Sequence, residues 1–251
     1  SCGTPSRGWL LLALADGRLG GPMLQSFGDD IWLADGPIAG VAGFDYPTRM
    51  AIIRLSGGAL FIWSPVALTH QLRTAVDALG EVRYVIAPNS LHHLALGDWR
   101  RAYPDAKLYA PPGLRAKRKD ITFDADLTDA PPAEWREDID QVLVRGNMIT
   151  TEVVFFHHNS GSAIFTDLIQ HFSPNWFHGW RAVVAKLDRM TESEPAVPNK
   201  FRNTFLNRRA ARAALKRVLA WPTRKVLMAH AAPIHDDGHT FLVRAFRWLM
   251  T

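Results

Sequence analysis

The stretch that most constrains the fold is residues 155–167, FFHHNSGSAIFTD. Strand-forming residues at 152–156 lead into two adjacent histidines, and a Ser-Gly-Ser turn separates them from a second apolar run that ends in Asp167. We therefore expect two adjacent strands whose ends deliver an imidazole and a carboxylate to one edge of a sheet. A metal ion or a catalytic water could be held at that edge.

The rest of the chain indicates further strands and helices. Apolar runs at 49–55 and 59–63 flank three small turn residues, which predicts a β-hairpin. Ser64 followed by Pro65 is typical of a helix start, and Asp35-Gly36 predicts a turn after a strand. Further strands are expected at 82–87, 107–110, 141–144 and 225–229, and helices at 94–102, 208–221 and 241–250.

This order of elements predicts an α/β fold. Two strand-rich halves, each accompanied by helices, suit a four-layer αββα sandwich, although another α/β arrangement would give the same pattern. We interpret residues 23–251 as one domain. Residues 1–22 are interpreted as an N-terminal extension, poorly ordered or left from cloning, with a trimmed export signal as the alternative.

Composition limits the chemistry. The chain has 251 residues, of which 47% are hydrophobic and 21% charged, as in globular proteins. No apolar run approaches the roughly 18 residues that a membrane span needs, so we predict a cytoplasmic protein without a membrane span. The single cysteine, Cys2, excludes an internal disulfide framework and a cysteine-built zinc site. Ten histidines and the carboxylates remain as candidate metal ligands.

Candidate ligands follow several expected strands. The strand at 82–87 leads to Asn89, His92 and His93, and the last strand ends in His230. Ligands commonly bind beyond the carboxyl ends of strands in α/β sheets, so these residues and Asp167 are expected to share a site. A single histidine at a strand end is more often structural. Adjacent histidines on an extended backbone point apart, which leaves open which of each pair faces the site.

Over residues 27–250 the order and spacing of these motifs resemble the metallo-β-lactamase superfamily. Residues 85–94, VIAPNSLHHL, stand where that superfamily has T-H-x-H-x-D-H, and residues 158–162, HNSGS, stand in place of H-T-P-G-S. Met228-Ala229-His230-Ala231 matches a late strand that ends in histidine. The resemblance is closest to a little-characterised branch that carries P-N-x-x-H-H and T-D-L, here Pro88 to His93 and Thr166 to Leu168.

The resemblance implies a metallo-β-lactamase-like fold and a metal site with departures from the superfamily motif. The two leading histidines of the motif become Asn89 and Leu91, so one divalent metal is favoured over two. Zinc suits the remaining donors best, iron and manganese stay open, and a site without metal is the alternative. The implied metal ligands are His92, His93, His158, Asp167 and His230. Asp167, His93 and Asp98 are the implied catalytic residues, Asp98 as a group that orients a ligand or accepts a proton.

The leading hypothesis is a metal-dependent hydrolase of an ester, lactone, amide or phosphoester that uses a metal-activated water on a small-molecule substrate. The alternative is a non-catalytic binding or scaffold protein that keeps the fold with a decayed metal site. A weaker alternative is a nuclease or nucleic-acid binder, motivated by basic segments at 115–119 and 202–217. The sequence names neither the substrate nor the oligomeric state.

Overall fold

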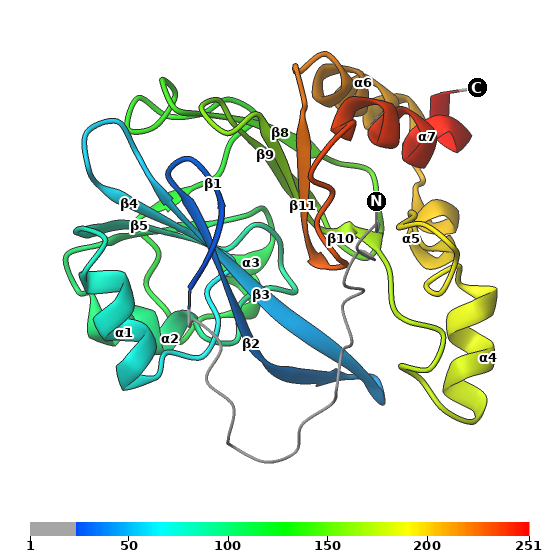
Figure 1. Cartoon of the computed structure of the whole chain (residues 1–251), viewed down its shortest axis with the longest axis horizontal. Coiled ribbons are helices and arrows are strands. Elements are labelled where there is room, and N and C mark those ends of the chain that lie inside the picture. The colour runs from blue at the N-terminus through cyan, green and yellow to red at the C-terminus, as the bar shows by residue number, and fades with distance from the viewer. Residues whose placement is uncertain (1–23, 251) are drawn as a thin grey trace, which may run out of the picture.

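Two β-sheets lie face to face between two sets of helices in the computed structural model, which describes residues 24–250 (Figure 1). The first sheet has seven strands in sequence order, antiparallel from β1 to β4 and parallel from β4 to β7. Its strands are β1 (Gln25–Gly28), β2 (Ile31–Val41), β3 (Phe44–Arg54), β4 (Leu60–Trp63), β5 (Val82–Ile86), β6 (Lys107–Ala110) and β7 (Ala125–Asp126).

The second sheet has four strands in the order β11-β10-β9-β8. Neighbours are antiparallel except β10 and β11, which are parallel. These strands are β8 (Ile139–Val144), β9 (Glu152–His157), β10 (Ser162–Gln170) and β11 (Lys225–His230). Because β9 and β10 form an antiparallel pair, the end of β9 lies beside the start of β10, with His157 opposite Ser162.

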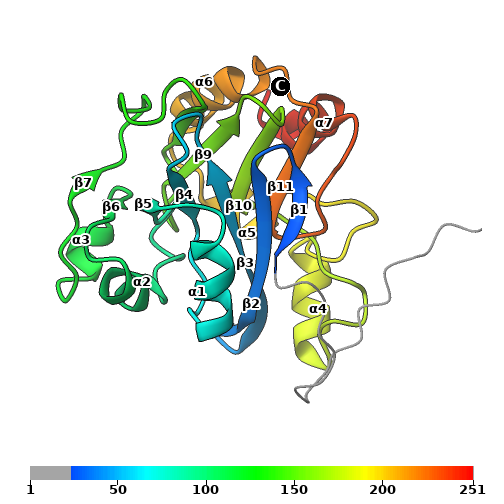
Figure 2. The same cartoon turned by 60° about the vertical axis from the view of Figure 1, so that its left-hand side comes forward.

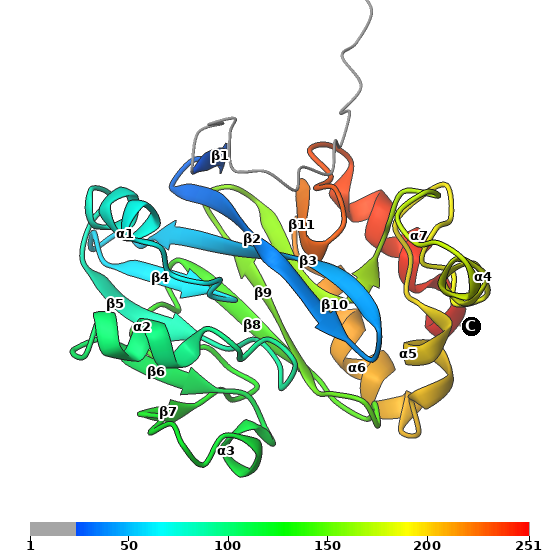
Figure 3. The ribbon, with the colours of Figure 1, turned by 90° about the horizontal axis from the view of Figure 1, so that it is seen from below.

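Seven helices accompany the sheets within the described residues (Figure 2). Helices α1 (His70–Asp77), α2 (Leu96–Ala102) and α3 (Leu114–Lys117) belong to the first half, and α4 (Trp180–Leu187), α5 (Asn199–Thr204), α6 (Arg208–Leu219) and α7 (Gly238–Met250) follow the second-sheet strand β10. Viewed from below, α1 and α2 lie on the outer side of the first sheet and α6 and α7 on the outer side of the second (Figure 3).

Three buried cores hold these layers together. The first-sheet strands pack on α1 and α2 through side chains such as Met50, Val76 and Trp99. Phe155 lies in the core between the two sheets, whereas its neighbour Phe156 lies in the core under α6 and α7. Successive strand residues point to opposite faces of a sheet, so this one strand supplies both cores. The predicted four-layer αββα fold is confirmed.

Several predicted elements are confirmed, including the hairpin of β3 and β4 and the strands β5, β6 and β11. The predicted turn at Asp35-Gly36 is wrong, because β2 continues through it to Val41. A Cβ atom at Gly36 would lie 2.6 Å from Cβ of Val66, so this glycine allows close packing and not a turn. The predicted helix start at Ser64 is also wrong, since α1 begins at His70 with Thr69 as its N-cap.

The long hairpin of β2 and β3 extends past the rest of its sheet toward α4 (Figures 1 and 2). Phe44, in the hairpin, packs edge-on against Trp180 of α4 at 5.5 Å between ring centroids. The predicted extension at residues 1–22 lies outside the described residues. Within residues 24–250, no helix combines the length and apolarity needed to cross a membrane.

Candidate metal centre

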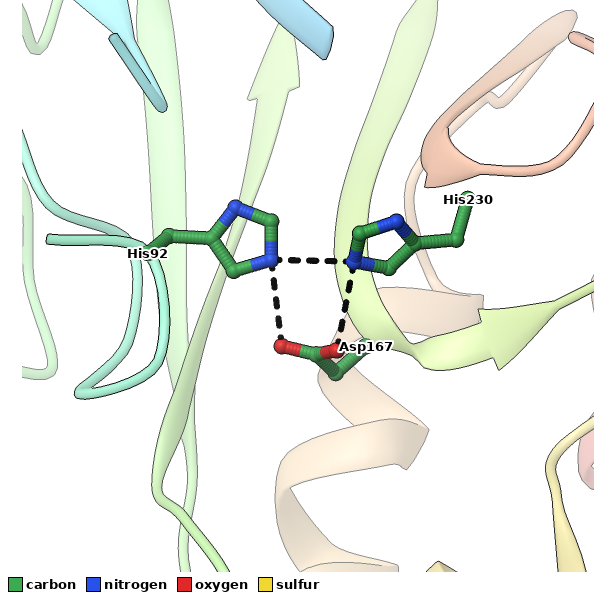
Figure 4. Close-up of side chains that lie close together, drawn as sticks. All are labelled: His92, Asp167 and His230. Carbon is green, nitrogen blue, oxygen red and sulfur yellow. Dashed lines mark hydrogen bonds and ion pairs between the residues drawn. The ribbon is translucent and has the colours of Figure 1, made fainter. Parts of the chain in front are cut away.

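Side chains from three separate segments meet at one edge of the two sheets. His92 lies in the loop after β5, Asp167 lies in β10, and His230 is the last residue of β11. The His92 Nε2 and His230 Nε2 atoms are 3.2 Å apart. Asp167 lies below both rings, with Oδ2 3.2 Å from His92 Nε2 and Oδ1 3.4 Å from His230 Nε2 (Figure 4). Two imidazole nitrogens and a carboxylate therefore converge on one point.

Outer hydrogen bonds fix both imidazole rings. Nδ1 of His230 donates to the carbonyl oxygen of Pro47 at 2.8 Å, which leaves Nε2 with a lone pair when the ring is neutral. Nδ1 of His92 lies 2.8 Å from the hydroxyl oxygen of Ser64. Metal-binding histidines usually have such a partner on the second ring nitrogen, because it sets the tautomer and the ring orientation.

The Asp167 carboxylate is also held in place. Asn89 donates from Nδ2 to Asp167 Oδ2 at 2.7 Å, and Gln170 donates from Nε2 to Oδ1 at 3.2 Å. Below it, the buried carboxylate of Glu152 accepts the backbone N–H groups of Thr166, Asp167 and Leu168 at 2.7, 2.8 and 3.0 Å. The backbone on both sides of Asp167 is therefore anchored from within the protein.

Burial and charge act in opposite directions on Asp167. Burial favours the neutral acid. Hydrogen bonds with His92 and His230, together with the charges of these two residues, outweigh burial and hold the pKa of Asp167 well below its usual range. Asp167 is thus a carboxylate at neutral pH. Burial and, second, the negative charge of Asp167 raise the pKa of Glu152 to about 7.

The donor atoms fit a divalent cation. Ligand atoms placed about 2.1 Å from a tetrahedral zinc ion are roughly 3.4 Å from each other. The two imidazole nitrogens, 3.2 Å apart, are close to that spacing, and the Asp167 carboxylate approaches them with different oxygens, Oδ2 at 3.2 Å from His92 and Oδ1 at 3.4 Å from His230. Among residues 24–250, His92, Asp167 and His230 are the set of histidine and carboxylate groups close enough together to share a metal ion.

The structure does not bring His158 to this group. Our expectation that the ends of β9 and β10 share a sheet edge is wrong, because antiparallel pairing places them at opposite edges. His158 is exposed, with Nδ1 2.9 Å from the carbonyl oxygen of Glu137 and Nε2 3.2 Å from Asp140 Oδ2. The residue of β9 that lies near Asp167 is Glu152, at the start of the strand.

His93 and Asp98 also lie apart from the three donors. Arg118 Nη1 donates to Nδ1 of His93 at 3.1 Å, so this ring faces the basic segment and not Asp167. Burial, followed by the charges of Lys117 and Arg118, lowers the pKa of His93 to about 4. Asp98 lies in α2 and forms an ion pair with Arg101. Both side chains line the cavity above the site, so their catalytic roles stay predictions.

A cavity of about 670 Å³ opens above the three donors. Its walls come from the β2–β3 hairpin, the loops after β4 and β5, and the region of α4 and α5. The donors lie at its buried end, since the side chains of His92, Asp167 and His230 are 10%, 7% and 5% exposed. A small molecule that enters the cavity would reach the donor atoms.

Sequence reasoning missed Ser64, Glu152 and Gln170. Ser64 was hidden because Ser-Pro is also a common helix start. Glu152 could have been found from the hairpin itself, since the first residue of β9 must lie near the last residues of β10. Gln170 is three positions after Asp167 in the sequence. Because both residues are in the extended strand β10, no local pattern indicates their contact.

A match to a known family model shows which protein family the chain belongs to. The model of a family described as a domain of unknown function (DUF4336) matches residues 28–178, which is more than half of the chain. The chain belongs to the DUF4336 family. The matched part of this DUF4336 protein includes β2 to β10, and therefore His92 and Asp167, but not His230. No curated protein matches the sequence.

Solved metallo-β-lactamases share the fold of this DUF4336 protein. TMB-1 is 11% identical in sequence with a TM-score of 0.63, and the matched region covers 93% of this chain and 100% of the TMB-1 chain. The mono-zinc form of FIM-1 from Pseudomonas aeruginosa is 9% identical with a TM-score of 0.60, covering 91% and 96%. A metallo-β-lactamase from Pontibacter korlensis is 10% identical with a TM-score of 0.60, covering 89% and 98%. These similarities confirm the metallo-β-lactamase fold.

Proposed function

We propose that this protein is a metal-dependent hydrolase that holds one divalent cation with His92, Asp167 and His230. The observation that carries the proposal is the convergence of the three donor groups at the buried end of a cavity, at separations of 3.2 to 3.4 Å. Three protein ligands with a position left for water or substrate is the composition of a catalytic zinc site. The metallo-β-lactamases of the same fold, one of them in a mono-zinc form, support this function.

The substrates we propose are esters, lactones, amides or phosphoesters. A bound divalent cation would supply Lewis acidity, which polarises a carbonyl or phosphoryl oxygen and makes water a stronger acid. The chain's own residues would hold the cation and exclude bulk water from the cavity. In the overall reaction one water is consumed. The scissile bond to the leaving oxygen or nitrogen breaks, hydroxyl joins the carbonyl carbon or phosphorus, and a proton joins the leaving group.

Asn89 and Leu91 support one cation and not two. Both ends of the Asn89 amide are used, because Oδ1 accepts the backbone N–H groups of Leu91 and His92 at 2.8 and 3.0 Å while Nδ2 donates to Asp167 and Thr166. The side chain of Leu91 has no atom that could bind a metal ion. The positions where the superfamily motif has two histidines therefore offer no metal ligand here. Zinc is the proposed ion, and iron and manganese are the alternatives for a mixed histidine and carboxylate site.

Metal analysis of the purified protein tests the proposal. We expect about one equivalent of zinc, iron or manganese after purification without chelators, or uptake of one equivalent by titration. Asp167→Ala and His230→Ala should abolish uptake. His158→Ala is the control, because that exposed histidine lies at the opposite sheet edge. Absence of uptake for all three metals by folded wild-type protein would refute the proposal.

A non-catalytic binding protein is the second candidate function. It is favoured by the hydrogen bonds to Asp167, since Asn89 and Gln170 each donate to one oxygen of the carboxylate without an ion. Under this alternative, the metal titration shows no uptake, and the cavity still binds a ligand. We do not propose nucleic-acid binding, because Arg115, Arg118 and Arg217 of the basic segments pair with Asp126, Asp120 and Asp129.

A further inference from the structure

The wall of the cavity carries little free charge. Lys200 Nζ donates to the Tyr46 hydroxyl and to Gln170 Oε1, each at 3.1 Å, and lies 3.4 Å from Asp188 Oδ2. Its three donor hydrogens and its positive charge therefore have partners inside the protein. Asp98 is paired with Arg101.

Lys117 is the remaining lysine of the cavity lining within the described residues. It is exposed and donates to the carbonyl oxygen of Ser90 at 2.9 Å. Because its side chain is exposed, this ammonium group is in contact with solvent. In the described part of the chain, Lys200 and Asp98 of the lining have ion-pair partners and Lys117 faces solvent, so the buried part of the wall offers no unpaired ion to hold a charged substrate.

Most of the remaining lining is apolar. Met190 and Phe201 are buried, at 2% and 1% exposure, and line the inner wall. The outer wall has large apolar side chains that face solvent, with Ile38 58%, Leu94 69% and Val184 41% exposed. Exposed apolar side chains gathered around a concave site are typical of ligand-binding grooves. They come from the β2–β3 hairpin, the loop after β5 and α4, which enclose the same cavity.

The cavity is therefore mainly apolar, with the three candidate donor groups at its buried end. A molecule that fits has one polar, uncharged group for the buried end and an apolar chain for the remainder. The volume of about 670 Å³ is in the middle of the range for small-molecule sites, roughly 300–1,000 Å³. It exceeds what a small acid such as acetate, or its esters, would fill.

We infer that the cavity binds esters, amides or lactones with a medium-length alkyl acyl chain, with the carbonyl group at His92, Asp167 and His230 and the chain along Met190, Phe201 and Val184. This inference rests on the proposed hydrolase function for the reaction, but the apolar recognition of the chain is independent of it. Hydrolysis of such an acyl ester consumes one water and yields the carboxylic acid and the alcohol.

Binding of methyl ketones tests chain recognition without any reaction. These molecules keep the carbonyl group and the alkyl chain but have no bond to hydrolyse. We expect affinity, measured by calorimetry on metal-loaded and metal-free protein, to rise about three- to four-fold per methylene from 2-hexanone to 2-decanone. Equal affinity across the series would overturn the inference.

A pair of matched variants locates the binding. Val184 in α4 lines the cavity and is 41% exposed, whereas Val243 in α7 lies outside it and is 43% exposed. Both are exposed helical valines, so glutamine at either position should leave the fold intact. Val184→Gln should weaken 2-decanone binding several-fold, and Val243→Gln should not change it. An equal effect of the two variants would contradict the inference.

A kinetic measurement tests the hydrolase proposal separately from the binding experiment. For the zinc-loaded protein, we expect kcat/KM with p-nitrophenyl ester substrates to rise from the butanoate to the octanoate. If ketone affinity rises with chain length but no ester is hydrolysed with zinc, iron or manganese, the ligand class stands and the hydrolase function fails. If esters are hydrolysed but neither affinity nor kcat/KM depends on chain length, the hydrolase function stands and the acyl-chain inference is refuted.

Discussion

Nδ2 of Asn89 lies 2.7 Å from Oδ2 of Asp167, and this contact joins the loop after β5 to strand β10. Asn89 is fully buried, and its Oδ1 accepts two backbone N–H groups of the loop that carries His92. One amide therefore positions both a histidine and the carboxylate of the candidate metal centre. In the superfamily motif that residues 85–94 resemble, a histidine stands at this position. In this protein the Asn89 side chain instead holds His92 and Asp167 in place through hydrogen bonds.

Asn89→Ala should therefore weaken both stability and metal binding. It removes the acceptor of the N–H groups of Leu91 and His92 and one of the donors to the Asp167 carboxylate, so we expect a loss of about 2–4 kcal/mol in the free energy of unfolding. Urea denaturation measures this loss, and calorimetry measures the metal affinity. Asn159→Ala is the control, since that asparagine is exposed and donates to Asp30 on the surface. Equal stability of Asn89→Ala and wild type would contradict the role assigned to Asn89.

Glu152 is expected to matter for stability through the backbone of β10. Its two carboxylate oxygens accept three N–H groups, and glutamine offers one oxygen in their place. Glu152→Gln should leave at least one buried N–H without an acceptor and lower the free energy of unfolding by about 1–3 kcal/mol. Glu137→Gln is the matched control, because its side chain is 81% exposed and forms only a surface ion pair. An unchanged denaturation midpoint for Glu152→Gln would rule out this role.

Ser64 is expected to act on metal affinity through His92. Its hydroxyl oxygen lies 2.8 Å from His92 Nδ1, and its backbone is in the left-handed region, with φ of 52°. Ser64→Ala removes the hydroxyl and keeps the backbone strain, whereas Ser64→Gly removes the hydroxyl and tolerates that φ. Loss of an outer partner of a metal-binding histidine typically costs about 10- to 100-fold in affinity.

Both Ser64 variants should therefore lose metal affinity to a similar extent, measured by competition with a chromophoric chelator. Ser56→Ala, which removes an exposed hydroxyl beside Asp138, should not change it. If Ser64→Ala binds metal as wild type does, the hydroxyl does not position His92.

The sequence predicted the layers of the fold better than the details of the site. Apolar runs of strand length indicated the strands, and their order suited the αββα arrangement, although it also permitted another α/β fold. Asp167 and His230 were found because each directly ends an apolar strand run. His158 was placed wrongly because sequence adjacency to Asp167 hides the reversal of direction in an antiparallel hairpin. Ser64 was interpreted as a helix cap because Ser-Pro has that local meaning, and only tertiary structure shows its hydroxyl beside His92.

His157 and His93 each belong to a pair of adjacent histidines, and each has a different kind of partner. His157 ends β9 with a side chain that is buried and bonded to Ser160, at 2.8 Å from Nδ1 to Oγ. His93 contacts Arg118, which follows it by 25 positions in sequence. The partner of His93 is too far away in sequence for a local pattern to indicate. The partner of His157 lies only three positions on, but that spacing does not show which of the adjacent histidines is buried, so the choice between them needed the structure.

His157 should make stability depend on pH. Burial is the main cause that lowers its pKa to about 4, opposed by the charges of Asp138 and Asp30 and assisted by His158. In the unfolded chain histidine has a pKa of about 6.5. Between these values the unfolded chain binds a proton that the folded protein does not, so stability falls as pH drops from about 6.5 to about 4. The loss from this residue should be about 2–4 kcal/mol over that window.

Urea denaturation at several pH values between 4 and 7 checks this expectation. His157→Asn keeps a polar atom near the position of Nδ1 but cannot be protonated, so its stability should fall less over the window than that of wild type. Ser160→Ala is the control, because it removes the hydroxyl partner and keeps the titrating ring. It should be less stable than wild type at every pH while keeping the same pH dependence. If His157→Asn loses as much stability as wild type between pH 6.5 and 4, another group is responsible for the acid sensitivity.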